Sequence, residues 1–239
     1  MNIPIGIETH TFSLIGRCQR TGRLGVAVTT SSITVGSRCP FVRPFVGAVS
    51  TQNLTDPRLG PFALRLMEMG YSAPRALQEI ESSDPYIERR QLGLVDRDGN
   101  SAARTGSLNG EWAGHIIKRN YVAMGNGLVG DQVIQAMSFA FQENEQDTLE
   151  ERLLRAVEAG QDAGGEARDL SPQHSAALLV YDTHAFPRVD LRVDEHPKPL
   201  VELRRIFEIY KPQIDYFLVR ASDPDAAQSL KESPERINP

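Results

Sequence analysis

The sequence predicts an α+β fold, a four-layer αββα sandwich of two mainly antiparallel sheets stacked face to face and covered outside by helices. Three observations support this prediction. The strand-like segments come as hairpins, and the helix-like segments come in consecutive pairs. The apolar run Leu24–Val28 is typical of a strand buried on both faces. A doubly wound parallel sheet would instead alternate single strands with single helices.

The first part of the chain is expected to be mostly sheet. The segment Thr11–Ile15, the turn at Gly22 and the run Leu24–Val28 make the first predicted hairpin, and Phe45–Thr51 is the next predicted strand. Both apolar runs lack charged residues, so we expect Leu24–Val28 and Phe45–Thr51 to be central strands that are almost wholly buried.

A pair of helices and a second hairpin follow. Pro61 suits the first turn of one helix, and Ser72 suits the N-cap of the next. The strands Gln91–Val95 and Ser101–Thr105 flank the glycine-containing segment 96–100. This segment is typical of a hairpin turn and lacks the closing Glu that a calcium-binding loop needs.

The second half continues with a strand, two helices, more strands and a last helix. Tyr121–Met124 precedes a helix from about Gly130 to Phe141, and Thr148 with Glu151 has the pattern of a capping box that opens another helix. The remaining predicted elements are the strands Ser175–Tyr181 and Val189–Val193 and an amphipathic helix over 200–210.

Length and composition predict one globular domain. The chain has 239 residues, of which 40% are hydrophobic, and this excludes a disordered chain. We expect an N-terminal extension over 1–9, a single αββα domain over 10–220 and a C-terminal tail over 221–239. The 26 Lys and Arg against 31 Asp and Glu give a net charge of −5 without a basic stripe, so we expect no nucleic-acid partner.

Several functional classes are excluded by missing patterns. The sequence has no run of 18 apolar residues, and Met1–Ile5 lacks the charged start of a signal peptide, so we predict a cytoplasmic protein with no membrane partner. Cys18 and Cys39 fit neither a disulfide framework nor a metal-binding spacing. No P-loop and no H-E-x-x-H motif is present, so the sequence names no cofactor and no metal ligand.

One glycine motif needs separate treatment. Gly125, Gly127 and Gly130 have the G-x-G-x-x-G spacing of a dinucleotide-binding turn. That motif requires the next helix to return to a parallel strand, whereas here a charged loop leads into a second helix. We therefore interpret the glycines as a turn that lets a strand enter a helix.

Ten segments together resemble the DUF1028 family, in order and with similar spacing over about residues 10–212. They are Thr11–Ile15, Gly22, Gly25–Val28, Val35–Ser37, Gly47–Gln52, Arg90–Gly93, Gly125–Asn126, Ala163–Gly165, Ser175–Leu178 and Val189–Pro197. That family is similar to the N-terminal-nucleophile (Ntn) hydrolase-like group, which has an αββα sandwich. The resemblance implies that a Thr, Ser or Cys at the start of the first strand attacks an amide carbonyl, with its own α-amine as the base.

The resemblance and the polar residues at strand ends give the candidate catalytic residues. Thr11 or Ser13 would be the nucleophile or a water-positioning hydroxyl, and Gln52 with Asn126 would bind the carbonyl oxygen. His196 would assist proton transfer or recognise a carboxylate.

The candidate substrate-binding residues suggest an acidic ligand. Arginines in the loops around the Phe45–Gln52 strand and in the long loop before Ser175 can grip a carboxylate with two hydrogen bonds. The candidates are Thr51, Arg38, Arg43, Arg58, Arg168 and Ser175.

The leading functional hypothesis is a hydrolase of a C–N amide or cyclic amide bond in a small, carboxylate-bearing molecule. The alternative is a non-catalytic small-molecule binding protein that keeps the fold, because ten residues precede Thr11 and a blocked Thr11 has no free α-amine. We also expect a homodimer, since symmetric pairing is the commonest oligomer.

Overall fold

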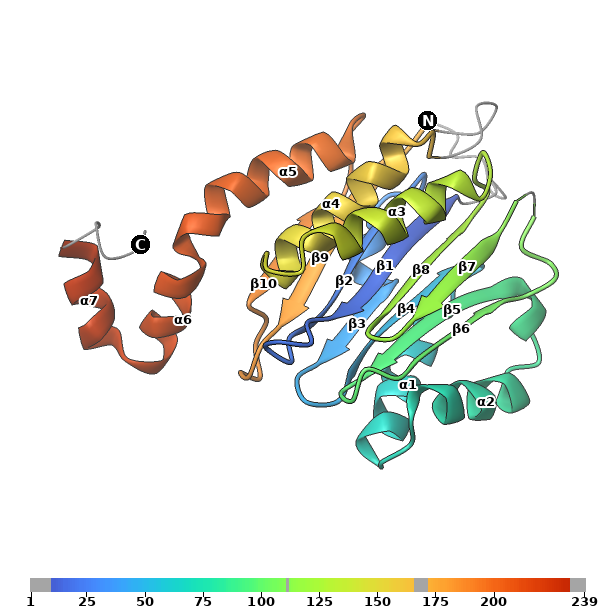
Figure 1. The fold of residues 1–239 in the computed structure, drawn as a ribbon, viewed down its shortest axis with the longest axis horizontal. Helices are drawn as coiled ribbons and strands as arrows, with labels where there is room; N and C mark the ends of the chain where they lie inside the picture. The colour runs from blue at the N-terminus through green and yellow to red at the C-terminus, as the bar shows by residue number, and fades with distance from the viewer. Residues whose placement is uncertain (1–9, 111, 166–171, 233–239) are drawn as a thin grey trace.

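Two antiparallel sheets lie face to face in the computed structural model, which describes residues 10–110, 112–165 and 172–232 (Figure 1). The strands are β1 (Thr11–Arg17), β2 (Leu24–Thr30), β3 (Pro40–Arg43), β4 (Gly47–Asn53), β5 (Arg90–Asp96), β6 (Ser101–Thr105), β7 (Gly114–Lys118), β8 (Tyr121–Asn126), β9 (Ser175–Tyr181) and β10 (Val189–Val193). One sheet has the order β10-β9-β2-β1-β8-β7 and the other β3-β4-β5-β6.

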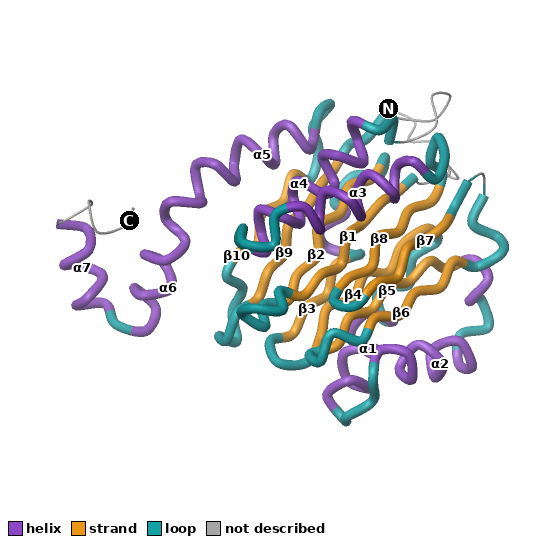
Figure 2. Tube along the Cα trace, in the orientation of Figure 1, coloured by secondary structure: helices purple, strands orange, loops and turns teal. Residues whose placement is uncertain are grey.

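Helices cover the outer face of each sheet, which completes the predicted αββα layers (Figure 2). They are α1 (Leu59–Glu68), α2 (Ala73–Ser83), α3 (Gln132–Glu143), α4 (Leu149–Asp162), α5 (Pro199–Tyr210), α6 (Ile214–Ser222) and α7 (Pro224–Glu232). The pair α3 and α4 covers the six-stranded sheet, and α1 with α2 covers the four-stranded sheet. The last two helices, α6 and α7, extend away from the sandwich. No helix within the described ranges has the length and apolar character that a bilayer crossing requires.

The layer between the sheets holds a small apolar cluster beside a polar one. Ile15, Val26 and Met124 of the six-stranded sheet pack against Ala48 and Val95 of the other, and all five are fully buried. Burial of such side chains contributes about 1.5–3 kcal/mol for each large one, which holds the two sheets together.

The first of the two predicted central strands is confirmed, and the second begins later than expected. Every residue of β2 is buried, so the Leu24–Val28 prediction is right. In the other run, β4 begins at Gly47, and Phe45 is 62% exposed with a φ of 61°. Phe45 belongs to the β3–β4 turn, where its backbone must adopt the left-handed region, so its apolar side chain faces solvent.

Neither predicted cap makes the expected side-chain bond. The Ser72 hydroxyl makes no side-chain cap bond to α2, and Pro74 at the second helical position has no N–H to offer it, while Oδ2 of Asp96 accepts the Ala73 N–H at 2.9 Å. Glu151 does not complete a capping box with Thr148, because its carboxylate binds Arg204 of α5 and Lys211, which follows α5. In the second case, ion pairs to residues distant in sequence take the place of the local capping hydrogen bond.

Two edge strands were not anticipated. The four-residue strand β3 begins with a proline, and β7 alternates too weakly to predict a strand. Both lie at sheet edges, where proline and exposed polar residues are tolerated. The expected boundary between domain and tail at 220 falls inside α6.

Candidate functional site

The start of β1 places two hydroxyl side chains at the centre of the molecule. β1 lies between β2 and β8, and Thr11 pairs with Thr30 on one side and Asn126 on the other. The Thr11 and Ser13 side chains are buried, and Ser13 faces the other sheet, where its hydroxyl lies 3.2 Å from the Ser50 hydroxyl. Both candidate nucleophiles therefore stand in the interior rather than on a surface.

A chain of side-chain amides crosses the layer between the sheets. The Ser13 hydroxyl donates to Oε1 of Gln52 at 2.5 Å. Nε2 of Gln52 donates to the Thr11 carbonyl at 3.1 Å and to Oε1 of Gln91 at 2.6 Å. The same Gln91 oxygen accepts a hydrogen bond from Nδ2 of Asn126 at 3.0 Å. The structure thus brings together four of the five predicted catalytic residues through Gln91, while their catalytic roles stay predictions.

Gln91 also connects this network to a histidine. Its Nε2 lies 2.9 Å from the Thr105 hydroxyl oxygen, and that oxygen lies 2.8 Å from Nδ1 of His115. Burial lowers the pKa of His115 below its ordinary value of 6.5. His115 is therefore a neutral imidazole at pH 7, and it is half-buried at the edge of the network.

Two donors hold the carbonyl oxygen of the His10–Thr11 peptide bond. The Thr30 hydroxyl donates to it at 2.7 Å and the Ser31 N–H at 3.1 Å. Because this bond uses the only hydroxyl proton of Thr30, the Thr11 hydroxyl is the donor in its 2.8 Å contact with Thr30. Thr30 therefore fixes the direction of the Thr11 hydroxyl and polarises the carbonyl that precedes it.

A glycine makes room for His10 at this point. Gly127 follows β8 with a φ of 61°, and a Cβ built on it would lie 1.6 Å from Nδ1 of His10. Only glycine satisfies both the left-handed backbone and this close approach. The turn that resembles a dinucleotide fingerprint therefore serves the start of β1.

The other predicted site residues lie elsewhere. Thr51 is next to Gln52 on β4, so its side chain points to the opposite face, where its oxygen accepts a hydrogen bond from Thr55. The Ser175 hydroxyl binds the backbone of Ser32 and Val35. Nδ1 of His196 accepts the Lys198 N–H.

The three described candidate arginines are engaged outside the network. Arg38 binds Thr34 and the Ile33 carbonyl, Arg43 pairs with Glu68, and Arg58 pairs with Asp56. None of their hydrogen bonds reaches Gln52 or Asn126. Arg168 lies outside the described residues. The argument from arginines to a carboxylate-bearing substrate therefore loses the support of these three side chains.

Sequence reasoning missed residues that the network needs. Gln91, Thr30, Thr105 and His115 were not selected, although Gln91 lies just before the buried run Leu92–Val95 of β5 and Thr30 ends β2 after the buried run Leu24–Val28. A polar residue at the end of a strand that is buried on both faces is the signal that was available. Across residues 10–110, 112–165 and 172–232, no three His, Cys, Asp or Glu side chains are grouped to hold a metal ion.

Comparisons with known proteins identify the family. Residues 11–203 match a family model described as a family of unknown function, DUF1028. The crystal structure of protein SPO2555 from Silicibacter pomeroyi, assigned to the same family, is 31% identical, with a TM-score of 0.77 over 84% of this chain and 89% of that one. The Anbu (ancestral beta-subunit) protein from Yersinia bercovieri is 13% identical, with a TM-score of 0.39 over 82% of this chain and 93% of that one. None of the curated proteins matches this sequence.

Proposed function

The chain belongs to the DUF1028 family, and from this premise we propose that it hydrolyses a C–N amide or cyclic amide bond of a small molecule, with Thr11 as its nucleophile. The observation that carries this proposal is the buried network of hydroxyl and amide side chains around the start of β1. A buried cluster of polar groups does not stabilise a fold more than apolar side chains would, so its presence here supports a functional role. Departures from apolar packing are expected at functional sites.

Cleavage of the peptide bond before Thr11 is the first step of the proposal. Oγ1 of Thr11 attacks the carbonyl carbon of His10, the C–N bond breaks, and the hydroxyl proton passes to the departing amine nitrogen, leaving an ester. The Thr11 α-amine is then free, and water hydrolyses the ester, which releases residues 1–10 with a carboxylate on His10 and restores the Thr11 hydroxyl. The two donors on the His10 carbonyl oxygen support this step, because they stabilise the negative charge that develops there.

The freed chain end would then act on the substrate. An α-amine with a pKa of about 8 accepts the hydroxyl proton at neutral pH, so Thr11 Oγ1 can attack a substrate carbonyl. The second N–H of Asn126 would donate to the resulting oxyanion, and Gln52 would do so by giving up its bond to the Thr11 carbonyl or to Gln91. Gln91 is a positioning residue in this scheme, since its Oε1 accepts from both amides and fixes their orientation.

A second function is favoured by one observation. Thr11 is 3% exposed and amide-linked to His10, so the unprocessed chain presents neither a free α-amine nor an accessible hydroxyl. A protein that stays in this state would bind a small molecule without turning it over.

Intact mass of the purified protein separates the two functions. The hydrolase proposal expects wild-type protein and Thr11→Ser to lose residues 1–10, and Thr11→Ala to keep them. Thr183→Val is the matched control, because Thr183 lies in an exposed loop. A wild-type chain that keeps its full mass after prolonged incubation contradicts the hydrolase proposal and favours binding.

Turnover is then measured on a panel of amides, hydantoins and lactams, with processed wild-type protein, processed Thr11→Ser, and Thr11→Ala as purified. We expect Thr11→Ala to lower kcat by at least about a thousandfold, and Thr11→Ser to restore part of the activity. Full activity of the alanine variant on any hydrolysed compound would exclude Thr11 as the nucleophile.

A further inference from the structure

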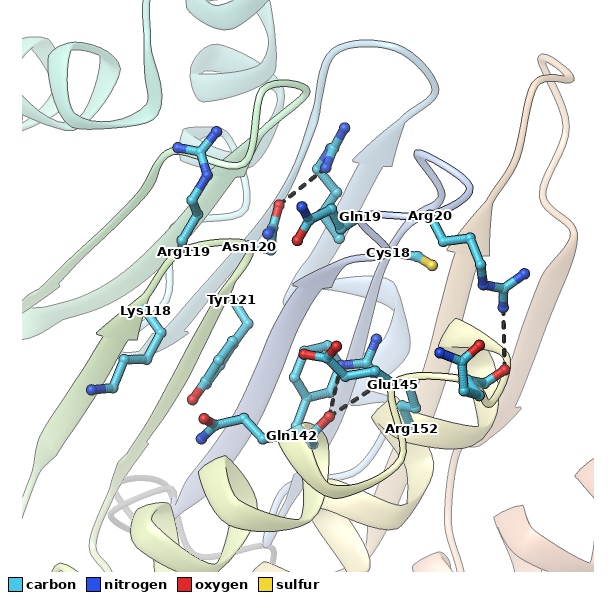
Figure 3. Close-up of a pocket in the computed structure, with 13 residues that line it drawn as sticks. Cys18, Gln19, Arg20, Lys118, Arg119, Asn120, Tyr121, Gln142, Glu145 and Arg152 are labelled. Carbon is cyan, nitrogen blue, oxygen red and sulfur yellow. Dashed lines mark hydrogen bonds between the residues drawn. The ribbon is translucent and has the colours of Figure 1, made fainter.

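A polar cavity lies at the opposite end of β1 from Thr11. It has a volume of about 510 Å³ and is formed by the β1–β2 turn, the β7–β8 turn, the end of α3 and the start of α4 (Figure 3). Since the seven residues of β1 span about 20 Å, this cavity is separate from the network around Thr11. We propose that it binds a small molecule through a phosphate or diphosphate group.

The charge of the lining is the first support. Five cationic side chains line the cavity with one carboxylate, Glu145, although the whole chain has a net charge of −5. The cations are Arg17, Arg20, Lys118, Arg119 and Arg152. Figure 3 shows Arg20, Arg119 and Arg152 on different sides of the hollow. Such a concentration of one charge attracts an anion of more than one negative charge.

The second support is that these cations lack acidic partners. Within the described parts of the chain, none of the five has a carboxylate oxygen within 4.0 Å, whereas Arg23, Arg104 and Arg204 each do. The cavity arginines bind neutral oxygen atoms instead: Arg17 binds Oδ1 of Asn120, and Arg20 binds the Gln146 carbonyl. Their positive charges therefore have no carboxylate in direct contact, and Glu145 and Asp147 act on Arg152 only at longer range.

For two of the five cavity cations, burial adds to the free-energy cost of a charge that lacks a counterion in contact. Arg152 is only 6% exposed, and Nε of Arg17 is buried with no hydrogen-bond partner among the described residues. A buried cation without a counterion is expensive, so such a group is typically matched by a ligand or a carboxylate. An anion in the cavity would supply the missing charge.

Arg152 is also rigidly presented. Its Nε and Nη2 donate to the Phe141 carbonyl at 3.1 and 2.7 Å, and its guanidinium lies 4.1 Å from the centre of the Phe141 ring. Among the described residues these are the hydrogen bonds of Arg152, so both N–H groups of Nη1 and one of Nη2 are left to bind a ligand in the cavity. A planar guanidinium held in one orientation suits phosphate oxygens, which accept several parallel hydrogen bonds.

The cavity is larger than one ion needs. A volume of about 510 Å³ is within the range of small-molecule sites, and Tyr121, Gln19 and Gln142 add neutral hydrogen-bonding groups to the lining. The ligand class that fits is therefore a phosphorylated small molecule whose remaining part contacts the amides and the tyrosine.

Inorganic pyrophosphate is the probe that tests this site on the full chain. Calorimetry at constant ionic strength is expected to give one binding site per chain, with at least about tenfold weaker binding in Arg152→Gln and in the double variant Lys118→Gln/Arg119→Gln. The double variant changes two exposed residues, so it keeps the test valid if Arg152→Gln does not fold.

A charge-matched control removes two positive charges elsewhere. Arg65 and Lys198 are exposed and lie outside the cavity, and Arg65→Gln/Lys198→Gln is expected to bind pyrophosphate as the wild type does. Equal weakening in the control would mean that general charge, not the cavity, attracts the anion, and it would overturn the proposal. Absence of binding at millimolar pyrophosphate in folded wild-type protein would overturn it as well.

Discussion

The Ser13 hydroxyl donates a 2.5 Å hydrogen bond to Oε1 of Gln52, and this contact joins β1, an interior strand of one sheet, to β4, an interior strand of the other. Both side chains are at most 1% exposed. The bond therefore lies where no water is available to replace a lost partner, and it links a candidate nucleophile to a candidate oxyanion donor.

Removing the Ser13 hydroxyl is expected to destabilise the fold. Ser13→Ala leaves Oε1 of Gln52 without its donor, which costs about 1–3 kcal/mol of unfolding free energy. Urea unfolding followed by circular dichroism measures the change. Ser101→Ala is the control, because its hydroxyl makes only a 3.5 Å contact with the Gly99 carbonyl. A stability loss of equal size in both variants would contradict an important role for the inter-sheet bond.

The layers of the fold follow from local patterns that the chain states clearly. An uncharged apolar run such as Leu24–Val28 is stable only when it is buried between the layers. Amphipathic helices that come in pairs pack on the outer faces of the sheets. The prediction that Phe45 is a buried strand residue is wrong, because the left-handed backbone of the β3–β4 turn, not hydropathy, sets its exposure. The capping box at Thr148 does not form because Arg204 and Lys211, which are distant in sequence, bind the Glu151 carboxylate that would complete it.

The same distinction between local patterns and distant contacts explains which site residues could be predicted from the sequence. Gln52 and Asn126 both lie near the start of β1 because each is near the end of a buried strand. Asn126 is on β8, which pairs with β1, and Gln52 is on β4, which faces β1 from the other sheet. Gln91 unites them only through the register of two sheets, and no single segment encodes that register. The arginines around β4 were selected by loop position alone, and acids such as Glu68 and Asp56 lie nearer to them than the network does.

Gly127 is expected to tolerate no side chain. Gly127→Ala introduces a Cβ into the space of the His10 ring and forces a residue with a side chain to keep a φ of 61°. Strain of this kind costs about 1–3 kcal/mol, and the displacement of His10 would also slow cleavage before Thr11. Thermal unfolding and intact mass measure the two effects.

Gly22→Ala is the matched control for this change. Gly22 also has a positive φ, of 74°, but nothing lies within 4 Å of its Cβ position. The difference between the two variants isolates the contact with His10. If both variants unfold alike and are processed alike, the close approach of His10 has no consequence.

The stability of the protein is expected to depend on His115 below pH 6.5. Burial holds the pKa of His115 in the folded chain below its ordinary 6.5, so the unfolded chain binds more protons in the window just below that value. Its contribution to stability is therefore present above pH 6.5 and is lost as the pH falls. His115→Gln is expected to flatten this part of the curve of unfolding free energy against pH.

Urea unfolding at a series of pH values from 7.5 to about 5 measures this slope. His184→Gln is the control, since His184 lies in the β9–β10 loop far along the chain from the network. A slope that is the same in wild type and His115→Gln would show that burial of His115 has no effect on stability.

The two cysteines are expected to react at very different rates. Burial opposes ionisation of Cys18, but hydrogen bonds from Thr21 and the Arg20 backbone, with the Arg20 charge, lower the pKa of its thiol overall. Burial raises the pKa of Cys39 to about 12, so at pH 8 only about one Cys39 in ten thousand is a thiolate. Cys18 also lines the basic cavity, where an anionic reagent is attracted. We therefore expect iodoacetate to modify Cys18 first.

Timed alkylation of the native protein with peptide mass spectrometry measures both rates. Cys18→Ser is the control, and its remaining thiol is expected to stay unmodified until the chain is unfolded. Pyrophosphate at saturating concentration is expected to slow the modification of Cys18, because it would occupy the same cavity and neutralise the charges that attract iodoacetate. Modification of Cys39 ahead of Cys18 in the folded chain would contradict the assigned difference between the two thiols, whereas a Cys18 rate that pyrophosphate leaves unchanged would count against the anion site alone.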